Sequence, residues 1–300
     1  MNGPAATATL TYVYAVAPPA PALDDLLPGL TGVAGTPVAL LTPEPADAGP
    51  VAFVISDVPR AEFAEDVLAG RFEDLGWLEE TARAHHHVIE ALAAHTTVLP
   101  LRMATLYEDH ARAVRALHEQ SQPFTTQLAQ LAAHTEYGVK LYVRHAAAPP
   151  ETTAPDRTAS PTPDDSAPAG PESASPGKAY LRARRAQRDA HEDRYQQAGI
   201  AADRVAEIGR LHSARHVAHP PQSGPLAAAS MGENVLNAAF LVPDAEAQSF
   251  TAAIGAAAGD LPGVVLELTG PWAPYSFTAL PRSPDPPSSA TSTSQADTRS

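Results

Sequence analysis

The stretch from residue 74 to residue 107, DLGWLEETARAHHHVIEALAAHTTVLPLRMATLY, decides the fold of this chain. Apolar side chains recur in its first half at steps of three and four residues, which predicts a long amphipathic helix with one buried stripe. The stripe comprises Leu75, Leu78, Ala82, His85, Ile89 and Leu92. Pro100 follows in a short extended piece. A long helix that leads directly into an extended segment is typical of domains that combine helices with a sheet.

Alternating and helical patterns flank this stretch on both sides. Large apolar side chains alternate with smaller or polar ones in several short segments, which predicts half-buried strands. These segments cover residues 10–16, 38–41, 51–55 and 137–143, and the last of them is expected to close the domain. Helical patterns cover residues 109–118 and 122–133, and Pro123 suits a first turn. We therefore expect an α+β domain whose sheet is covered on one face.

The C-terminal part begins with a long helical region at residues 178–217, in which small and apolar residues recur at heptad-like spacing. Small residues let a second helix approach closely, so this region resembles one arm of a helical hairpin or short coiled coil. Gly199 marks the point where the helix could break. A strand pattern, a helix pattern and a second strand pattern follow at residues 235–242, 244–258 and 264–269.

Two segments have a composition that opposes folding. Residues 147–177 carry eight prolines among Ser, Thr, Ala and acidic residues, without any Leu, Ile, Val or aromatic residue, and residues 281–300 are similar. Such segments bury too little apolar surface to offset the entropy of ordering, so we expect disorder there. The expected organisation is a tail at 1–7, a domain at 8–146, a Pro-rich linker at 147–177, a second domain at 178–280 and a tail at 281–300.

Charge and composition exclude several classes of function. The chain has 20 basic and 34 acidic residues, and a net charge of −14 repels the phosphates of nucleic acids. The absence of Cys removes disulfides, thiolate nucleophiles and Cys-based metal sites. Neither a secretory signal nor a run of about 18 apolar residues occurs, so we expect a soluble, cytoplasmic protein without a membrane partner. Residues 178–215 are locally basic, with 9 basic and 5 acidic residues, which fits either a solvated helix face or docking on an acidic partner.

Histidines are the first candidates for chemistry. His85, His86 and His87 are adjacent, and adjacent residues on a helix point about 100° apart, so they cannot hold one metal ion together. His85 lies on the apolar stripe and is expected to be a neutral histidine of the core or of a domain interface. His212 and His216 have the i, i+4 spacing of helical metal ligands but lack the Glu of a His-Glu-x-x-His motif. Since Gly-rich phosphate loops and acyl-transfer serine motifs are also missing, we expect no catalysis, no metal and no cofactor.

Four stretches are more distinctive than these histidines. They are YVYAV at 12–16, the 74–107 stretch, EYGVKLYV at 136–143, and LELTGPWAPYSF at 266–277 after the strand LNAAFLV at 236–242. In this order they resemble the GvpF/GvpL family of gas vesicle proteins, and TVLPLR and TGPWAPYSF are the specific elements. Met103 and Ala104 stand where the family usually has an aromatic residue and Gly, which could alter a turn because Gly is favoured at positive φ. Ala273 likewise replaces a second Pro.

The resemblance implies an α+β fold of two domains, with a modified ferredoxin-like N-terminal domain and an α+β C-terminal domain that carries a long helical arm. It also implies a non-enzymatic accessory protein of the gas vesicle that binds the small hydrophobic shell subunit, either to support assembly or as a minor shell component. The expected partners are the major gas vesicle shell protein and other gas vesicle accessory proteins. The candidate interaction or structural motifs are Leu99, Pro100, Leu101, Arg102, Trp272, Pro274 and Tyr275.

Alternative interpretations of these motifs and of the whole chain stay open. Trp272 and Tyr275 also fit a turn packed by aromatic side chains, and Arg102 also fits a helix cap or an ion pair. A metal- or His-dependent enzyme on an α+β sandwich would depend on His85, His212 or His216. A scaffold that recruits partners through its Pro-rich linker would lose function on deletion of residues 151–177, whereas a flexible spacer would tolerate that deletion. The substitution of all three histidines would test the enzyme.

Overall fold

The computed structural model describes residues 8–43, 50–144, 176–221 and 232–278. The chain forms two compact units, one of residues 1–132 together with 275–300, and the other of residues 133–274. We call them the N-terminal unit and the C-terminal unit. The expected tails at 1–7 and 281–300 lie outside the described residues, as does the expected linker except for Pro176 and Gly177, which belong to a helix.

Within the described part of the N-terminal unit, four strands form an antiparallel sheet in the order β2-β3-β1-β4. They are β1 (Thr9–Ala17), β2 (Ala39–Leu41), β3 (Ala52–Pro59) and β4 (Leu99–Tyr107). One short helix and two 3-10 turns connect β1 to β2, namely α1 (Pro21–Leu26), η1 (Leu27–Gly29) and η2 (Val33–Gly35). The strand order is that of a ferredoxin-like sheet, and the connection between its first two strands is reduced to short turns.

Two of the remaining described helices of this unit begin at a capping aspartate. The remaining described helices are α2 (Arg60–Phe63), α3 (Glu65–Arg71), α4 (Leu75–Ala93), α5 (His110–Glu119) and α6 (Ser121–Leu131), with the turn η4 (Tyr275–Phe277) at the C-terminal end. The Asp74 carboxylate accepts hydrogen bonds from the first amides of α4, and Asp109 does the same for α5. Such side-chain caps satisfy amides that have no partner within the helix. The predicted long helix in the first half of the 74–107 stretch and the predicted helices at 109–118 and 122–133 are confirmed.

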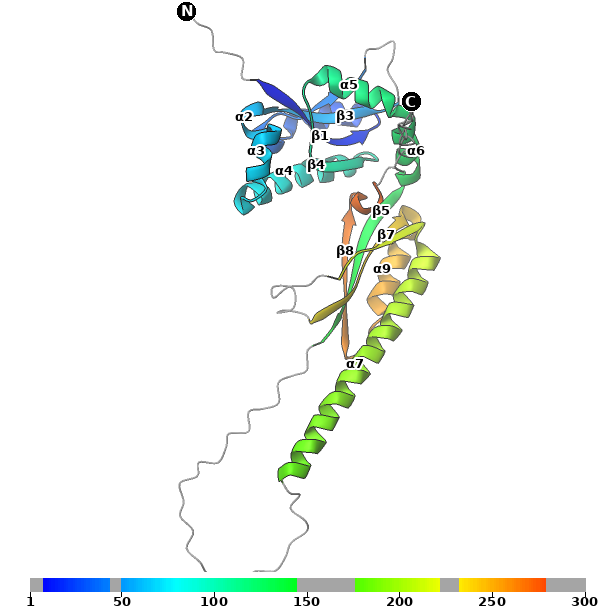
Figure 1. Cartoon of the computed structure of the whole chain (residues 1–300). Coiled ribbons are helices and arrows are strands. Elements are labelled where there is room, and N and C mark those ends of the chain that lie inside the picture. The colour runs from blue at the N-terminus through cyan, green and yellow to red at the C-terminus, as the bar shows by residue number, and fades with distance from the viewer. Residues whose placement is uncertain (1–7, 44–49, 145–175, 222–231, 279–300) are drawn as a thin grey trace, which may run out of the picture. The chain divides into compact units, whose positions relative to one another are not determined.

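The sheet of the N-terminal unit is covered on both faces, so the expectation of one covered face is wrong. Tyr12 and Ser56 are paired across β1 and β3 and face α4, where the Tyr12 ring meets His85. Phe53 points to the opposite face and packs edge-on against Phe124 of α6, with ring centroids 5.9 Å apart. Figure 1 shows α4 and α5 on opposite sides of these strands. Both alternating sets of β1 are therefore buried.

The buried stripe of α4 starts later than the sequence predicts. The side chains that it buries are Thr81, His85, Val88, Ile89 and Leu92. Leu75 and Ala82 were expected in this stripe, but both are exposed, and Leu75 exposes 78 % of its surface. The first turn of α4 therefore has an apolar side chain that the core does not use.

The C-terminal unit repeats the same strand order. Its described strands form an antiparallel sheet β6-β7-β5-β8. The elements are β5 (His134–Val143), α7 (Pro176–His212), β6 (Arg215–Ala218), β7 (Glu233–Pro243), η3 (Asp244–Glu246), α9 (Ala247–Ala256) and β8 (Val264–Trp272). The expectation that residues 137–143 close the N-terminal domain is wrong, because β5 is hydrogen-bonded on both sides, to β7 and to β8. The boundary between the units lies before β5 rather than after residue 146.

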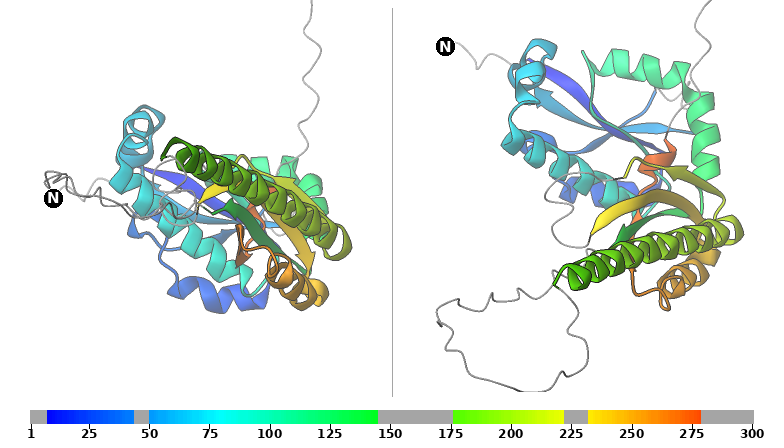
Figure 2. Two further views of the ribbon diagram at one scale, coloured as in Figure 1. Left: turned by 90° about the horizontal axis from the view of Figure 1, so that it is seen from below. Right: turned by 60° about the horizontal axis from the view of Figure 1, so that its bottom comes forward.

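The two described helices of the C-terminal unit, α7 and α9, lie against its sheet, as the two views of Figure 2 show. The alternating side chains Tyr137 and Val139 of β5 enter a core with Val205 of α7 and with Phe250 of α9. Leu141 and Val143 continue the same face into a second cluster beside α7. The alternation in the sequence is thus confirmed as the buried face of a strand, although in the other sheet.

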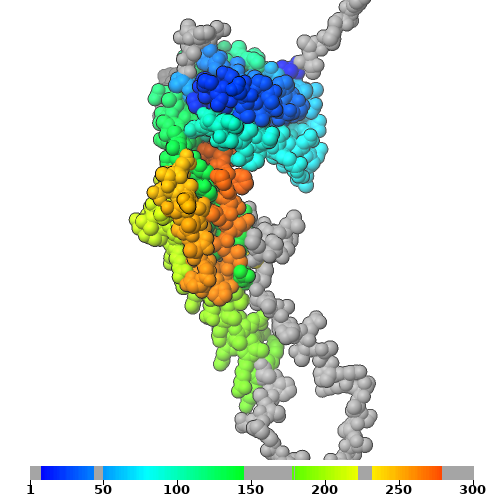
Figure 3. Space-filling view, turned by 180° about the vertical axis from the view of Figure 1, so that it is seen from behind, coloured from blue at the N-terminus to red at the C-terminus, as the bar shows by residue number. Residues whose placement is uncertain are grey.

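The long helix α7 runs unbroken through Gly199 and ends at His212, where the chain turns into β6. The prediction of helix up to residue 217 is therefore wrong at its end. The described side chains from Lys178 to Asp193 are all exposed, and the first buried one is Ala198. Figure 3 shows this first part of α7, in yellow-green, extending past the rest of its unit. The expected helical arm is present.

None of the described helices has a segment that is long and apolar enough to span a bilayer.

Candidate functional site

A buried hydrogen-bond network in the N-terminal unit links β1, α4 and β4. The Tyr12 hydroxyl lies 2.9 Å from Nδ1 of His85, and Nε2 of His85 lies 3.2 Å from the carbonyl oxygen of Leu101. The backbone amide of Ala104 donates to the Tyr12 hydroxyl at 3.1 Å. Since the Leu101 carbonyl can only accept, Nε2 donates to it, and Nδ1 accepts the Tyr12 hydrogen. We call these four residues the His85 network.

Burial decides the protonation of the network. The His85 side chain is 4 % exposed, and burial lowers its pKa from 6.5 to about 4, with a smaller contribution from the neighbouring His86. Burial likewise raises the pKa of Tyr12. Both groups are therefore neutral at physiological pH, and the expectation of a neutral core histidine is confirmed. A neutral histidine whose two nitrogens are both engaged is suited to fixing structure rather than to transferring protons.

The network fixes an irregular segment of the edge strand β4. Pro100 pairs with Ala15 and Thr105 pairs with Val13, so residues 101–104 leave the ladder between them. Ala104 has a φ of 61°, the left-handed region that favours glycine. At one end of this bulge the Leu101 carbonyl accepts a hydrogen bond from His85, and at the other end the Ala104 amide donates one to the Tyr12 hydroxyl. The bulge exposes the side chain of Arg102.

The structure brings only part of the predicted motif residues together. Leu99 and Pro100 are buried, Leu101 is half-buried and Arg102 is exposed, all on β4. Tyr275 lies in η4, which packs on β4, and its hydroxyl is 3.2 Å from Nδ1 of His86. Trp272 and Pro274 belong to the C-terminal unit. The indole of Trp272 at the end of β8 is 42 % exposed, so the alternative of a packed aromatic turn suits Tyr275 better than Trp272.

An exposed apolar surface at the start of α4 escaped the sequence analysis. It comprises Phe72, which is 44 % exposed, and the half-buried Trp77, whose ring centroid is 6.0 Å from that of Phe72, together with the exposed Leu75, which the two-residue spacing on α4 turns about 200° away from Trp77. We call these three residues the aromatic patch. A signal was available, since the Asp74 cap places Leu75 in the first turn, well ahead of the residues that the core buries.

A pocket of about 440 Å³ borders the aromatic patch, with Trp77 and Phe63 in its lining. Charged side chains also line the pocket, namely Glu62, Glu80 and Arg83, and Arg83 pairs with Glu79. An apolar centre with a charged rim is typical of surfaces that bind other proteins.

The histidines of the enzyme hypothesis are not assembled into a site. His212 ends α7, and its Nδ1 lies 2.9 Å from a carboxylate oxygen of Glu246. His216 lies on β6 and stacks on Phe240, so the expected i, i+4 pair on one helix does not exist. In residues 8–43, 50–144, 176–221 and 232–278, no three His, Cys, Asp or Glu side chains gather closely enough to hold a metal ion.

Comparison with known proteins identifies the family. The family model described as gas vesicle synthesis protein GvpL/GvpF matches residues 10–279. The chain belongs to the GvpL/GvpF family. Gas vesicle protein L of Streptomyces sp. (strain CB03234) is 38 % identical over 276 residues, which cover 91 % of this chain and 94 % of that protein. The resemblance noted in the four stretches is thereby confirmed.

Two solved structures of GvpF share the fold. The protein from Anabaena sp. PCC7120 superposes with a TM-score of 0.58 over 91 % of this chain and 97 % of its own, at 15 % sequence identity. The protein from Microcystis aeruginosa gives a TM-score of 0.54 over 90 % and 99 %, also at 15 % identity. The two-domain α+β fold is confirmed. Membership of the GvpL/GvpF family gives the chain a role in gas vesicles.

Proposed function

We propose that this member of the GvpL/GvpF family supports gas vesicle assembly by binding the small hydrophobic shell subunit through the aromatic patch. The family supports the gas vesicle role, and the exposed patch is the observation that carries direct binding. A shell subunit that lines a gas space must present apolar surface, and this surface promotes aggregation before assembly. An apolar patch on an accessory protein covers such a surface.

The energetics of the patch suit a reversible contact. Leu75 exposes 78 % of its surface, and burying a leucine side chain contributes about 1.5 kcal/mol or more. Phe72 adds an exposed aromatic ring that packs edge-on against the Trp77 indole. The net charge of −14 keeps a complex dispersed by repulsion between copies. Such a contact is compatible with three roles: the protein holds the shell subunit before assembly, it nucleates shell growth, or it is incorporated into the shell as a minor component.

The decisive experiment is co-expression of the protein with the shell subunit, followed by pull-down and a solubility assay. The unmodified protein is expected to keep the shell subunit soluble and to co-purify with it. Leu75→Ser is expected to reduce the co-purified amount by several-fold. The matched control is Leu211→Ser, since Leu211 is another exposed leucine, 59 % exposed, on α7 of the other unit.

Equal loss for both leucine variants would show that apolar exposure in general, and not the aromatic patch, holds the subunit. If the shell subunit aggregates regardless of the accessory protein and never co-purifies, direct binding is wrong. The family role then depends on another accessory protein that bridges the two.

A further inference from the structure

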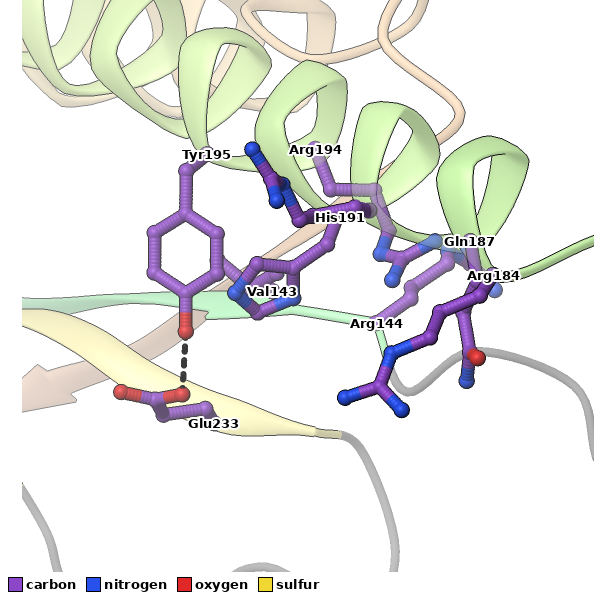
Figure 4. A pocket seen from close by; sticks show the side chains of 9 residues that line it. Val143, Arg144, Arg184, Gln187, His191, Arg194, Tyr195 and Glu233 are labelled. Atoms are coloured by element: carbon purple, nitrogen blue, oxygen red, sulfur yellow. Dashed lines mark hydrogen bonds between the residues drawn. The ribbon is translucent and has the colours of Figure 1, made fainter. Parts of the chain in front are cut away.

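A groove in the C-terminal unit lies between the exposed part of α7 and the adjacent ends of β5 and β7. Its volume is about 410 Å³. Figure 4 shows side chains from the helix and from both strand ends that face this space. The lining residues are Val143, Arg144, Arg184, Gln187, Arg188, His191, Arg194, Tyr195 and Glu233. We call it the cationic groove.

Positive charge dominates the described lining. Arg184 and Arg188 lie one turn apart on α7, Arg194 follows six residues later on the same helix, and Arg144 comes directly after β5; all four line the groove. The acidic residue in this lining, Glu233, already accepts a hydrogen bond from the Tyr195 hydroxyl. That bond raises the pKa of Tyr195, so the hydroxyl keeps its proton. The described lining thus has one carboxylate, Glu233, and four guanidinium groups, so most of the positive charge of the groove is not compensated within the lining.

The contacts that these arginines do make are weak or incomplete. Arg188 lies 3.9 Å from Glu192, and both side chains are more than 60 % exposed, so the pair contributes little. Nε of Arg194 is buried and has no hydrogen-bond partner among the described residues. Buried donors without an acceptor are rare in folded proteins.

The floor of the groove suits a side chain that has an apolar stem. The rings of His191 and Tyr195 pack with centroids 4.7 Å apart, and Val143 lies beside them. A glutamate places a short aliphatic stem behind its carboxylate, and arginine binds carboxylates through two parallel hydrogen bonds. A groove of arginines over an aromatic and aliphatic floor is therefore complementary to an acidic peptide.

We propose that the cationic groove binds an acidic peptide segment of a partner protein, whose carboxylates pair with Arg144, Arg184, Arg188 and Arg194. Nucleic acid is the less suitable polyanion, because nucleic-acid binding needs an extended basic surface, whereas these arginines line one groove of about 410 Å³. The site differs from the aromatic patch in its unit, its chemistry and its partner. It therefore adds a second contact to the proposed function and does not rest on it.

The test uses the full-length protein and two fluorescein-labelled peptides, one with six Glu residues separated by Gly and one with Gln in place of each Glu. Fluorescence anisotropy is expected to show at least about tenfold tighter binding of the Glu peptide, with affinity falling as salt rises. Arg184→Gln together with Arg188→Gln is expected to weaken binding about tenfold, which corresponds to about 1.4 kcal/mol. Both side chains are exposed, and circular dichroism checks that the helix persists.

The matched control is Arg182→Gln with Arg185→Gln, which removes the same charge from the same helix but outside the groove lining. This pair is expected to change the affinity less than about threefold, since only the general field of the helix weakens. Glu233→Gln is expected to tighten binding, because it removes a repulsive carboxylate from the groove.

Three outcomes overturn the proposal. The first is that the control pair weakens binding as much as the groove pair. The second is that neither peptide binds. The third is that a short oligonucleotide or inorganic phosphate binds more tightly than the Glu peptide.

A fourth test concerns the chain's own acidic residues at 145–175, which are a competing occupant of the groove. If deletion of residues 151–172 tightens peptide binding more than about tenfold, the groove serves that segment rather than a partner. The Leu75→Ser variant is expected to bind the Glu peptide as the unmodified protein does. A failure of the proposed shell binding can therefore be distinguished from a failure of the groove proposal.

Discussion

The buried His85 makes the stability of the N-terminal unit depend on pH. Its folded-state pKa of about 4 lies below the ordinary value of 6.5, because burial opposes the charged form. As the pH falls below 6.5, His85 binds a proton in the unfolded chain, whereas in the folded chain it stays neutral until the pH approaches 4. The contribution of His85 to stability is thus fully present above pH 6.5 and is lost as the pH falls toward 4.

The size of this effect follows from the two pKa values. A difference of about 2.5 pKa units corresponds to about 3 kcal/mol when the pH is below both values. At pH 5.5 the loss is about 1.4 kcal/mol, which is large enough to measure by urea unfolding. His85→Gln removes the titrating group and keeps a side chain that can both donate and accept. We expect this variant to be less stable at pH 7.5 and to lose less stability between pH 7.5 and pH 5.5.

The assay can isolate the N-terminal unit, because the chain has two tryptophans, one in each unit. In a Trp272→Phe background, fluorescence reports on Trp77 of α4, the helix that carries His85. His87→Gln is the matched control, since His87 lies on the same helix but is exposed. If His85→Gln and His87→Gln show the same change in free energy of unfolding with pH, the assignment of the pH dependence to the buried imidazole is refuted.

Two further predictions concern backbone positions of the N-terminal unit. Ala104→Gly is expected to raise the free energy of unfolding by about 1 kcal/mol, because a φ of 61° strains alanine and not glycine; a lower stability in urea unfolding would contradict this. Gly32→Ala is expected to cost about 2 kcal/mol, because the new Cβ would lie 2.1 Å from the Tyr14 hydroxyl oxygen. Gly29→Ala, which meets no atom of the described residues within 4 Å, is the control and should change stability by less than about 0.5 kcal/mol in the same assay.

Local patterns determined much of the candidate site. The periodicity of residues 74–107 gave the helix and the strand after it, and the position of His85 on the apolar stripe gave its neutral state. The resemblance to the GvpF/GvpL family, and not a local pattern, singled out Leu99–Arg102 and Tyr275, which the structure brings together around β4. The same resemblance places a family Gly at position 104, and Ala104 adopts positive φ there. The helix, the strand and the state of His85 depend on residues within a few positions of one another.

The sequence by itself therefore determined where most of the helices and strands lie and which charges the chain carries. Only the tertiary structure decided that β5 joins the C-terminal sheet, that Leu75 is exposed, and that four arginines line one groove. Alternation shows that a strand buries one face but not which strand it pairs with, because pairing depends on partners about 100 residues away, such as β7. Exposure at the end of a helix similarly depends on how far the opposing sheet extends, which no local pattern records.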